Sequence, residues 1–170
     1  VETAWAKPSW PLLHSGINRE LIHRWKFENR PELTSLLVEQ ALAHALPPAP
    51  PDLVVPIPMH WWRRLHRGYN QSALLAEVLT KACHGHWRRS VAVREVLAAR
   101  GWRRPQHRLD RPTRLHARRG GFHPTQSLQG LRVLLVDDVM TTGATLEAAA
   151  YACREAGARS VNAWCLVRTP

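Results

Sequence analysis

The sequence predicts an α/β fold with a central, mostly parallel sheet flanked by helices. Three apolar runs have the length and the β-branched composition of buried strands, at residues 53–57, 133–136 and 160–167. The first two are followed by polar loops and then by helical patterns at residues 71–81 and 144–156. This order of strand, loop and helix is typical of parallel βαβ units.

The N-terminal part is predicted to be an irregular arm followed by two helices. Residues 1–16 carry two prolines and show no periodicity. Residues 17–27 place apolar side chains at helical spacing, and a second helix is expected from about Pro31 to Leu46, where the proline-rich run 47–51 ends it. Residues 91–98 favour a further strand, although their composition also allows a short helix.

The composition predicts one domain with a polyanionic partner. The chain has 170 residues, enough for one core of ordinary size, and a net charge of +11 that comes mostly from arginine. Arginine favours bidentate recognition of phosphates, so pyrophosphate and nucleic acid are both expected partners, and charge alone does not separate them.

The cysteines and the apolar runs predict the compartment. Cys83, Cys153 and Cys165 are far apart and form no CxxC pair, so neither a disulfide framework nor a zinc site is expected, and the last two are interpreted as small buried hydrophobes. No run approaches the roughly 18 apolar residues of a membrane span, and no leader is visible. We therefore expect a cytoplasmic protein whose N-terminus has been trimmed or processed, since it begins at Val1.

The stretch LRVLLVDDVMTTGAT, residues 131–145, predicts the binding site. An apolar strand ends at Asp137 and Asp138, the acid pair, and a loop of small and hydroxylated residues leads into a helix. Backbone N–H groups at a helix N-terminus bind anions. Carboxylates repel a bare phosphate but accept hydrogen bonds from hydroxyls, so the expected ligand is a phosphate that carries hydroxyls. No P-loop or GxGxxG pattern is present. A plain crossover with an Asp cap is the alternative, but capping needs one acid and no cluster of threonines.

This stretch resembles the phosphoribosyl pyrophosphate (PRPP) signature of type I phosphoribosyltransferases. The resemblance implies their fold, a Rossmann-like sheet with a flexible loop and a small N-terminal helical hood. It implies that Asp137 and Asp138, the catalytic acids, hold the ribose hydroxyls and contact Mg²⁺ indirectly, through ribose or water. Purine-salvage members have a catalytic Asp at the position of Thr141. Orotate-type enzymes resemble this chain in having Thr there. The loop implied to bind the 5-phosphate consists of Val139, Met140, Thr141, Thr142, Gly143, Ala144 and Thr145.

A basic loop follows the strand at residues 53–57. It leaves the carboxyl end of a parallel-type strand, where α/β sheets bind ligands, although a solvated basic loop is the alternative. The sequence VPIPMHWWRRLHRGYNQSALLA resembles that of the ComF/GntX subgroup. The residues at the subgroup's matching positions are Arg64, Arg67, Gly68, Tyr69, Asn70 and Gln71. The resemblance implies a pyrophosphate loop with Pro58, Met59, His60, Arg63, Arg64 and Arg67.

Residues 99–119 hold eight arginines in a long polar stretch. Such a stretch inside a compact domain is usually a functional lid or a disordered segment. In type I phosphoribosyltransferases a flexible loop at this position closes over PRPP and excludes water. Which arginine reaches the pyrophosphate is left open, because residues 118–121 depart from the subgroup pattern. The implied loop residues are Arg104, Gln106, Arg111, Arg114 and Arg118.

The resemblance also implies a division of the chain. Residues 1–50 are expected to form the arm and hood within the same domain, and residues 51–170 the phosphoribosyltransferase core. Trp5, Trp10 and Trp25 of the hood are either core packing or a platform for a base. Full-length ComF-type proteins generally begin with a cysteine-rich zinc module that nothing in this chain matches. Either the module has been cut away or this member lacks it, so no zinc is expected in this chain.

Three functions remain open from the sequence. The first is an enzyme that transfers phosphoribosyl from Mg²⁺-PRPP to an unidentified base or amine and releases pyrophosphate. The second is a catalytically silent PRPP-binding or nucleotide-binding protein, such as a DNA-uptake (competence) factor. The third is a protein that binds DNA through its basic surface. A homodimer is one alternative for the oligomeric state, since dimers are common in the family.

Overall fold

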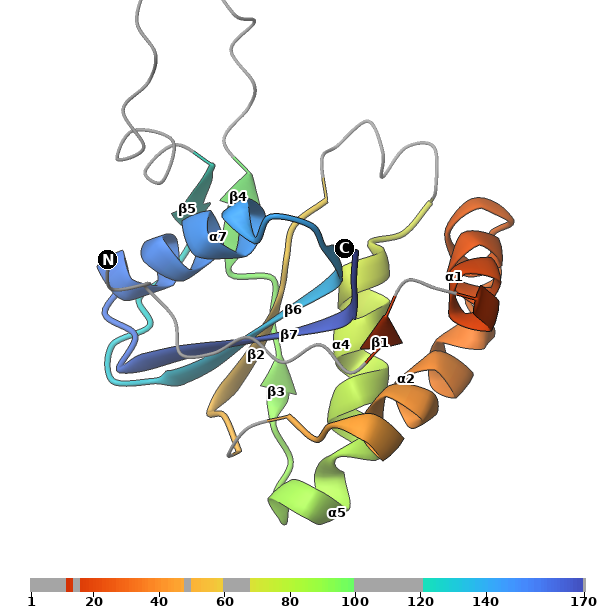
Figure 1. Ribbon diagram of the computed structural model, residues 1–170. Coiled ribbons are helices and arrows are strands. Elements are labelled where there is room, and N and C mark those ends of the chain that lie inside the picture. Colours follow the sequence, from red (N-terminus) through yellow and green to blue (C-terminus); the bar gives the residue numbers. More distant parts are fainter. Residues whose placement is uncertain (1–11, 14–15, 48–49, 60–67, 100–120, 170) are drawn as a thin grey trace, which may run out of the picture.

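The centre of the molecule is a five-stranded parallel sheet (Figure 1). The computed structural model describes residues 12–13, 16–47, 50–59, 68–99 and 121–169, without the side chains of residues 12–13 and 16–18. The predicted α/β fold with a parallel sheet is confirmed. In spatial order the strands are β1 (Leu12–Leu13), β7 (Ser160–Arg168), β6 (Arg132–Met140), β2 (Leu53–Pro56) and β3 (Ala92–Val93).

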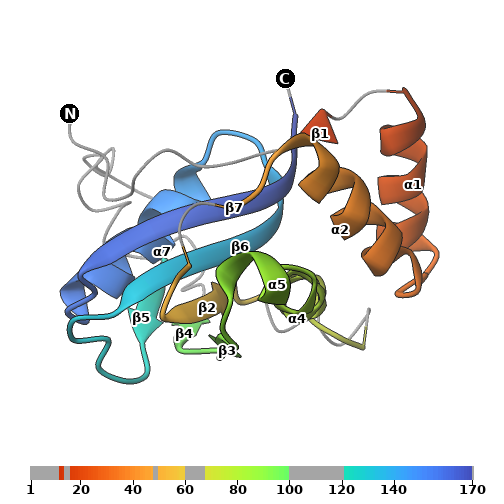
Figure 2. The same ribbon diagram turned by 90° about the horizontal axis from the view of Figure 1, so that it is seen from below.

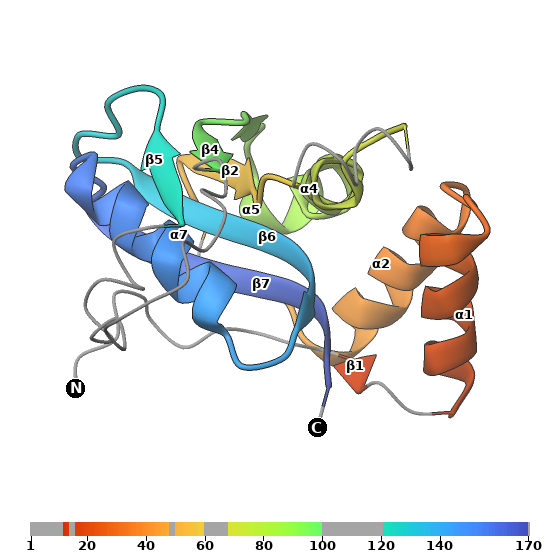
Figure 3. The same cartoon turned by 90° about the horizontal axis from the view of Figure 1, so that it is seen from above.

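Helices cover both faces of this sheet, with α7 on one side and α4 on the other (Figures 2 and 3). Leu134 of β6 packs in one core cluster with Leu75 of α4, whereas Leu135 packs in the other with Leu146 of α7. Burial on both faces explains why the strand is continuously apolar. None of the helices in the described residues is long and apolar enough to cross a membrane. The helices are α1 (Gly16–Phe27), α2 (Leu33–His44), α4 (Gln71–Ala82), α5 (His84–Trp87) and α7 (Ala144–Glu155).

Two predicted segments differ in the structure. Residues 1–16 were expected to be irregular, but β1 within them pairs in parallel with β7 at the sheet edge. Residues 91–98 do not form one strand, because the chain turns between Arg94 and Val96, whose N–H donates to the Arg94 carbonyl at 3.1 Å. The run therefore divides into β3 and a second strand, β4 (Leu97–Ala99), which pairs antiparallel with β5 (Phe122–Pro124) outside the main sheet.

The structure shows whether Trp25 and the cysteines pack in the core. Trp25 is fully buried in the core, so among the hood tryptophans this one is packing, while Trp5 and Trp10 lie outside the described residues. Cys153 and Cys165 are free thiols in the core, as predicted, and Cys83 is buried as well. Burial raises the pKa of the Cys83 thiol to about 11, so these cysteines act as hydrophobic side chains.

Candidate functional site

The acid pair lies inside strand β6 and not after its end. The strand was predicted to end at Val136, but its long neighbour β7 keeps pairing with it, so that Asp137 lies opposite Cys165 and Met140 opposite Arg168. The side chains of Val139 and Met140 consequently pack in the core on either face of the sheet. The part of the predicted phosphate loop outside regular structure is therefore limited to residues 141–143.

Asp137 is held by two hydrogen bonds to the same oxygen. Its Oδ1 accepts the Ser72 hydroxyl at 3.0 Å and the backbone N–H of Asp138 at 2.9 Å. Burial, followed by the charge of the neighbouring carboxylate, raises the pKa of Asp137 well above its ordinary value, and the two hydrogen bonds and the Lys26 ammonium offset only part of this rise. A partly buried acid with a raised pKa in an α/β sheet is a candidate functional group.

Asp138 forms an ion pair with a lysine from the hood. The Lys26 ammonium lies 2.6 Å from Asp138 Oδ2, and the two side chains are only 16% and 19% exposed. An ion pair at this depth is poorly screened by solvent, so its two charges attract more strongly than those of an exposed pair. The contact joins the last turn of α1 to β6 and places a positive charge beside two carboxylates.

Lys26 is the site residue that the sequence analysis missed. Gln71 Nε2 donates to the backbone carbonyls of Trp25 and Lys26, at 3.4 and 3.5 Å, and Trp25 Nε1 donates to the Thr34 hydroxyl at 2.9 Å. These bonds fix the end of α1 against α4 and α2. One signal was present in the sequence, because Lys26 is four residues after the buried Ile22 and thus lies on the helix face that packs inward.

The start of α4 is organised by the predicted Asn-Gln pair. Asn70 caps the helix by accepting the Ser72 N–H at 3.1 Å, while its amide donates to the Ile57 carbonyl and to Glu95 Oε1, each at 3.2 Å. Asn70 therefore connects the loop after β2 with the segment after β3. Together with Gln71, which holds α1, it positions Ser72 next to the acid pair, so the two motif residues have a scaffolding role in this structure.

The Thr/Gly loop leads directly into α7, as the sequence predicted. Thr141 and Thr142 are exposed, and Gly143 has a φ of 78°, a left-handed conformation that side chains disfavour. Thr142 Oγ1 accepts the Ala144 N–H at 3.4 Å, and Thr145 is exposed in the first helical turn. Hydroxyls, turn amides and the positive end of the helix dipole thus follow the acid pair directly along the chain, which is an arrangement suited to a phosphate.

The basic loops of the prediction are only partly described. Pro58 and Met59 are half-buried just after β2, and their strand is adjacent to β6. Antiparallel pairing of β4 and β5 brings Ala99 opposite Phe122, so the described residues that flank the arginine-rich segment pair with each other. The predicted residues outside the described part of the chain are His60, Arg63, Arg64, Arg67, Arg104, Gln106, Arg111, Arg114 and Arg118.

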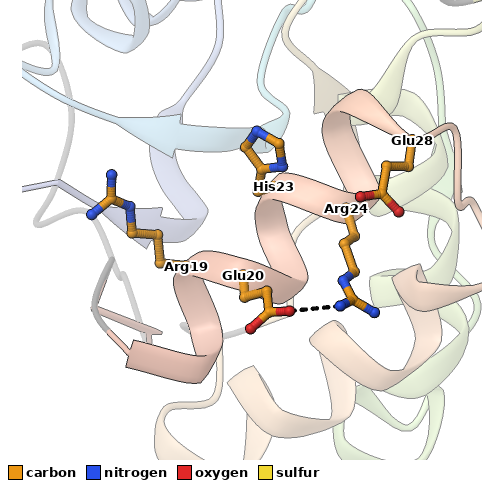
Figure 4. A pocket seen from close by; sticks show the side chains of 5 residues that line it. All are labelled: Arg19, Glu20, His23, Arg24 and Glu28. Carbon is orange, nitrogen blue, oxygen red and sulfur yellow. Dashed lines mark hydrogen bonds and ion pairs between the residues drawn. The ribbon is translucent and has the colours of Figure 1, made fainter.

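A hollow of about 380 Å³ on α1 does not extend this site. Figure 4 shows the five side chains that line it, four from α1 and Glu28 from the turn directly after it, with Arg24 bonded to Glu20 at 2.6 Å. The two arginines are accompanied by two glutamates, so the hollow has no net preference for an anion. No group of three metal-ligating side chains occurs in the residues that the structure describes. The lining residues are Arg19, Glu20, His23, Arg24 and Glu28.

Comparison with known proteins identifies relatives of this site. The family described as "Phosphoribosyl transferase domain" matches residues 71–170, which contain Ser72, the acid pair and the Thr/Gly loop. "DNA utilization protein YhgH" of Escherichia coli (strain K12) is 34% identical over 157 residues, 88% of this chain and 66% of that protein. "Competence protein F" of Haemophilus influenzae is 30% identical over 159 residues, 87% of this chain and 66% of that protein. The chain thus spans 66% of the length of these relatives.

A solved structure shares the fold. The glutamine PRPP amidotransferase from Bacillus subtilis, in complex with ADP and GMP, matches with a TM-score of 0.52 at 19% identity. The match covers 81% of this chain and 26% of the amidotransferase. At this identity the likeness establishes the fold and leaves the ligand to be argued from the site.

Proposed function

Because the chain belongs to the phosphoribosyl transferase domain family, in its ComF-like branch, we propose that it binds PRPP at the carboxyl ends of β6 and β2. In this proposal the Thr/Gly loop binds the 5-phosphate and the acid pair binds the ribose hydroxyls. The arginines of residues 58–67 and 100–120 would bind the pyrophosphate, because guanidinium groups form bidentate hydrogen bonds to phosphates and neutralise their negative charge.

The observation that carries the proposal is that the protein bonds to one oxygen of each carboxylate in the acid pair. The protein engages Oδ1 of Asp137 and Oδ2 of Asp138. Among the described residues, no side chain or backbone group bonds to the remaining oxygen of either carboxylate. Two acceptors on consecutive residues that precede a helix N-terminus suit two neighbouring hydroxyls on a sugar phosphate, and this fit favours ribose over a bare phosphate.

The proposed reaction is phosphoribosyl transfer. A nitrogen of the acceptor attacks C1 of the ribose, the bond from C1 to the pyrophosphate oxygen breaks, and pyrophosphate leaves with the electron pair. The attacking nitrogen gives up its proton to the departing pyrophosphate or to solvent. Mg²⁺, bound with PRPP, would neutralise the leaving group. The hard carboxylate oxygens of the acid pair suit contact with Mg²⁺ through water or ribose, whereas the adjacent Lys26 ammonium disfavours a metal bound directly to Asp138.

The test is calorimetric titration of Mg²⁺-PRPP into the protein, together with pyrophosphate release against a panel of purine, pyrimidine and amine acceptors. Saturable binding with release for one acceptor supports the transferase and names its substrate. Binding without release from any acceptor supports a silent PRPP-binding protein. Failure to bind Mg²⁺-PRPP contradicts the proposal.

A second candidate function is nucleic-acid contact in DNA uptake. It is supported by the net charge of +11 and by relatives named for DNA utilization and competence. Binding to phosphate backbones weakens steeply with salt, so affinity for single-stranded and double-stranded DNA should fall by orders of magnitude between low and physiological salt. Affinity that does not change with salt would contradict this candidate.

A further inference from the structure

Lys26 connects the hood to the proposed sugar site, and this contact suggests a role beyond folding. A lysine on a helix surface normally extends into solvent, yet the Lys26 side chain is 16% exposed and its ammonium contacts a carboxylate of the acid pair. The family match begins at residue 71 and does not include it. Its partner, Asp138, belongs to the motif from which the sugar site is proposed.

The contact is set by the packing of α1 and not by the lysine alone. The carbonyls of Trp25 and Lys26 accept the Gln71 side chain, and Trp25 is fully buried with its indole bonded to Thr34. A lysine on a mobile helix could swing away from the site when a ligand arrives. With both neighbouring contacts in place, the backbone at Lys26 is held, so its ammonium stays within reach of Asp138.

The remaining oxygens then have a defined arrangement. Ser72 and the Asp138 N–H orient Asp137 through Oδ1, and Lys26 orients Asp138 through Oδ2. Lys26 adds a positive charge beside the acid pair, which reduces the repulsion of an approaching phosphate. One oriented oxygen per carboxylate is what a vicinal diol requires.

We propose that Lys26 is a positioning residue for the sugar hydroxyls: it holds Asp138 by one oxygen and so aims the other at a ribose hydroxyl. This inference rests on the proposed function, because it specifies how the acid pair of that site recognises its ligand. It assigns to the hood a part in sugar recognition, in addition to any contact with the acceptor. The opposite role, a cation that blocks the site until ligand displaces it, gives the opposite result in the experiment below.

The experiment compares sugar phosphates that differ by one hydroxyl. Ribose 5-phosphate and its 2-deoxy and 3-deoxy analogues are titrated into the full chain and followed by NMR amide shifts. The proteins are the wild type, Lys26→Met, Lys26→Gln, Lys26→Arg and the matched control Lys81→Met, which changes an exposed lysine at the end of α4. Circular dichroism establishes that each variant is folded, and the Gln variant replaces the Met variant if that one does not fold.

We expect the wild type to discriminate against at least one deoxy analogue. Lys26→Met should weaken ribose 5-phosphate about tenfold while leaving that deoxy analogue nearly unchanged, since only the lost hydroxyl contact depends on Asp138. Lys26→Arg should restore part of the discrimination, and Lys81→Met should match the wild type. A purely structural lysine would weaken all three sugars equally.

Two results would overturn the inference without touching the proposed function. One is a Lys26→Met protein that keeps the wild-type discrimination between the sugars. The other is a Lys26→Met protein that binds ribose 5-phosphate more tightly than the wild type does, as removal of a blocking cation would produce. A wild type that binds none of the three sugar phosphates would instead contradict the proposed function, and the inference would fall with it.

Discussion

Two aspartates at opposite ends of the same sheet have opposite environments. Asp52, just before β2, accepts hydrogen bonds from the Arg132 backbone and guanidinium, at 2.8 to 2.9 Å, and from Arg89 at 2.8 Å. The two arginines hold the pKa of Asp52 far below its ordinary value. Asp137, near the carboxyl end of β6, has a raised pKa because it is buried next to another acid.

The comparison separates an acid that stabilises the fold from one that the fold tolerates. Both oxygens of Asp52 are engaged by cations, so its charge contributes to stability. Asp137 has only neutral donors on one oxygen, and its ionised form is disfavoured in the free protein. Asp137 therefore adds no stability to the fold. This is typical of functional sites, where residues that bind ligand often lower stability.

The largest effect on stability is expected from Asp52→Asn. The substitution keeps the shape but removes the charge from two arginine contacts, so the free energy of unfolding should fall by about 2 kcal/mol, a value already reduced for partial solvent screening. Urea unfolding at pH 7 measures it. Glu20→Gln, which breaks an exposed pair with Arg24, is the matched control and should change little. Equal unfolding midpoints for the two variants would contradict the assigned role of Asp52.

A smaller effect, of opposite sign, is expected from Asp137→Asn. The folded state raises the pKa of Asp137, so the wild type loses stability as the pH rises from the ordinary aspartate range through the folded pKa. The Asn variant should therefore be more stable by roughly 1–2 kcal/mol at pH 8 and equal at pH 4. Asp52 behaves inversely, because its contribution is lost as the pH falls below its ordinary pKa. If the free energies of unfolding of the wild type and Asp137→Asn change with pH in parallel, the raised pKa of Asp137 is contradicted.

The smallest effect is expected from Ser72→Ala. Loss of the hydroxyl removes one of two donors from Asp137, so unfolding free energy at pH 8 should fall by roughly 0.5–1 kcal/mol and the affinity for Mg²⁺-PRPP by about threefold. Urea unfolding and calorimetry measure the two quantities. Thr80→Ala serves as the control, because the bond of its hydroxyl within the described residues is to a helical carbonyl of α4, at 2.7 Å. A stability loss with unchanged affinity would indicate that Ser72 supports the helix and not the acid.

The sequence predicted the elements that local patterns determine. The apolar run before Asp137 and the glycine and threonines after it identified a strand, a loop and a helix start, and the structure confirms them. The end of β6 was mispredicted because it depends on the length of β7, which no local pattern contains. The Lys26 contact and the arginine clamp on Asp52 join residues far apart in the chain, so they became visible only once the helices and strands were packed.

The central claim is that the acid pair binds ligand while Asp52 supports the fold, and one titration tests it most directly. Mg²⁺-PRPP is added to the wild type, to Asp137→Asn with Asp138→Asn, and to Asp52→Asn, at a temperature where all three are folded. We predict at least about 100-fold weaker binding for the double variant, because two charged acceptors are lost, and wild-type affinity for Asp52→Asn. Unchanged affinity in the double variant would contradict the account.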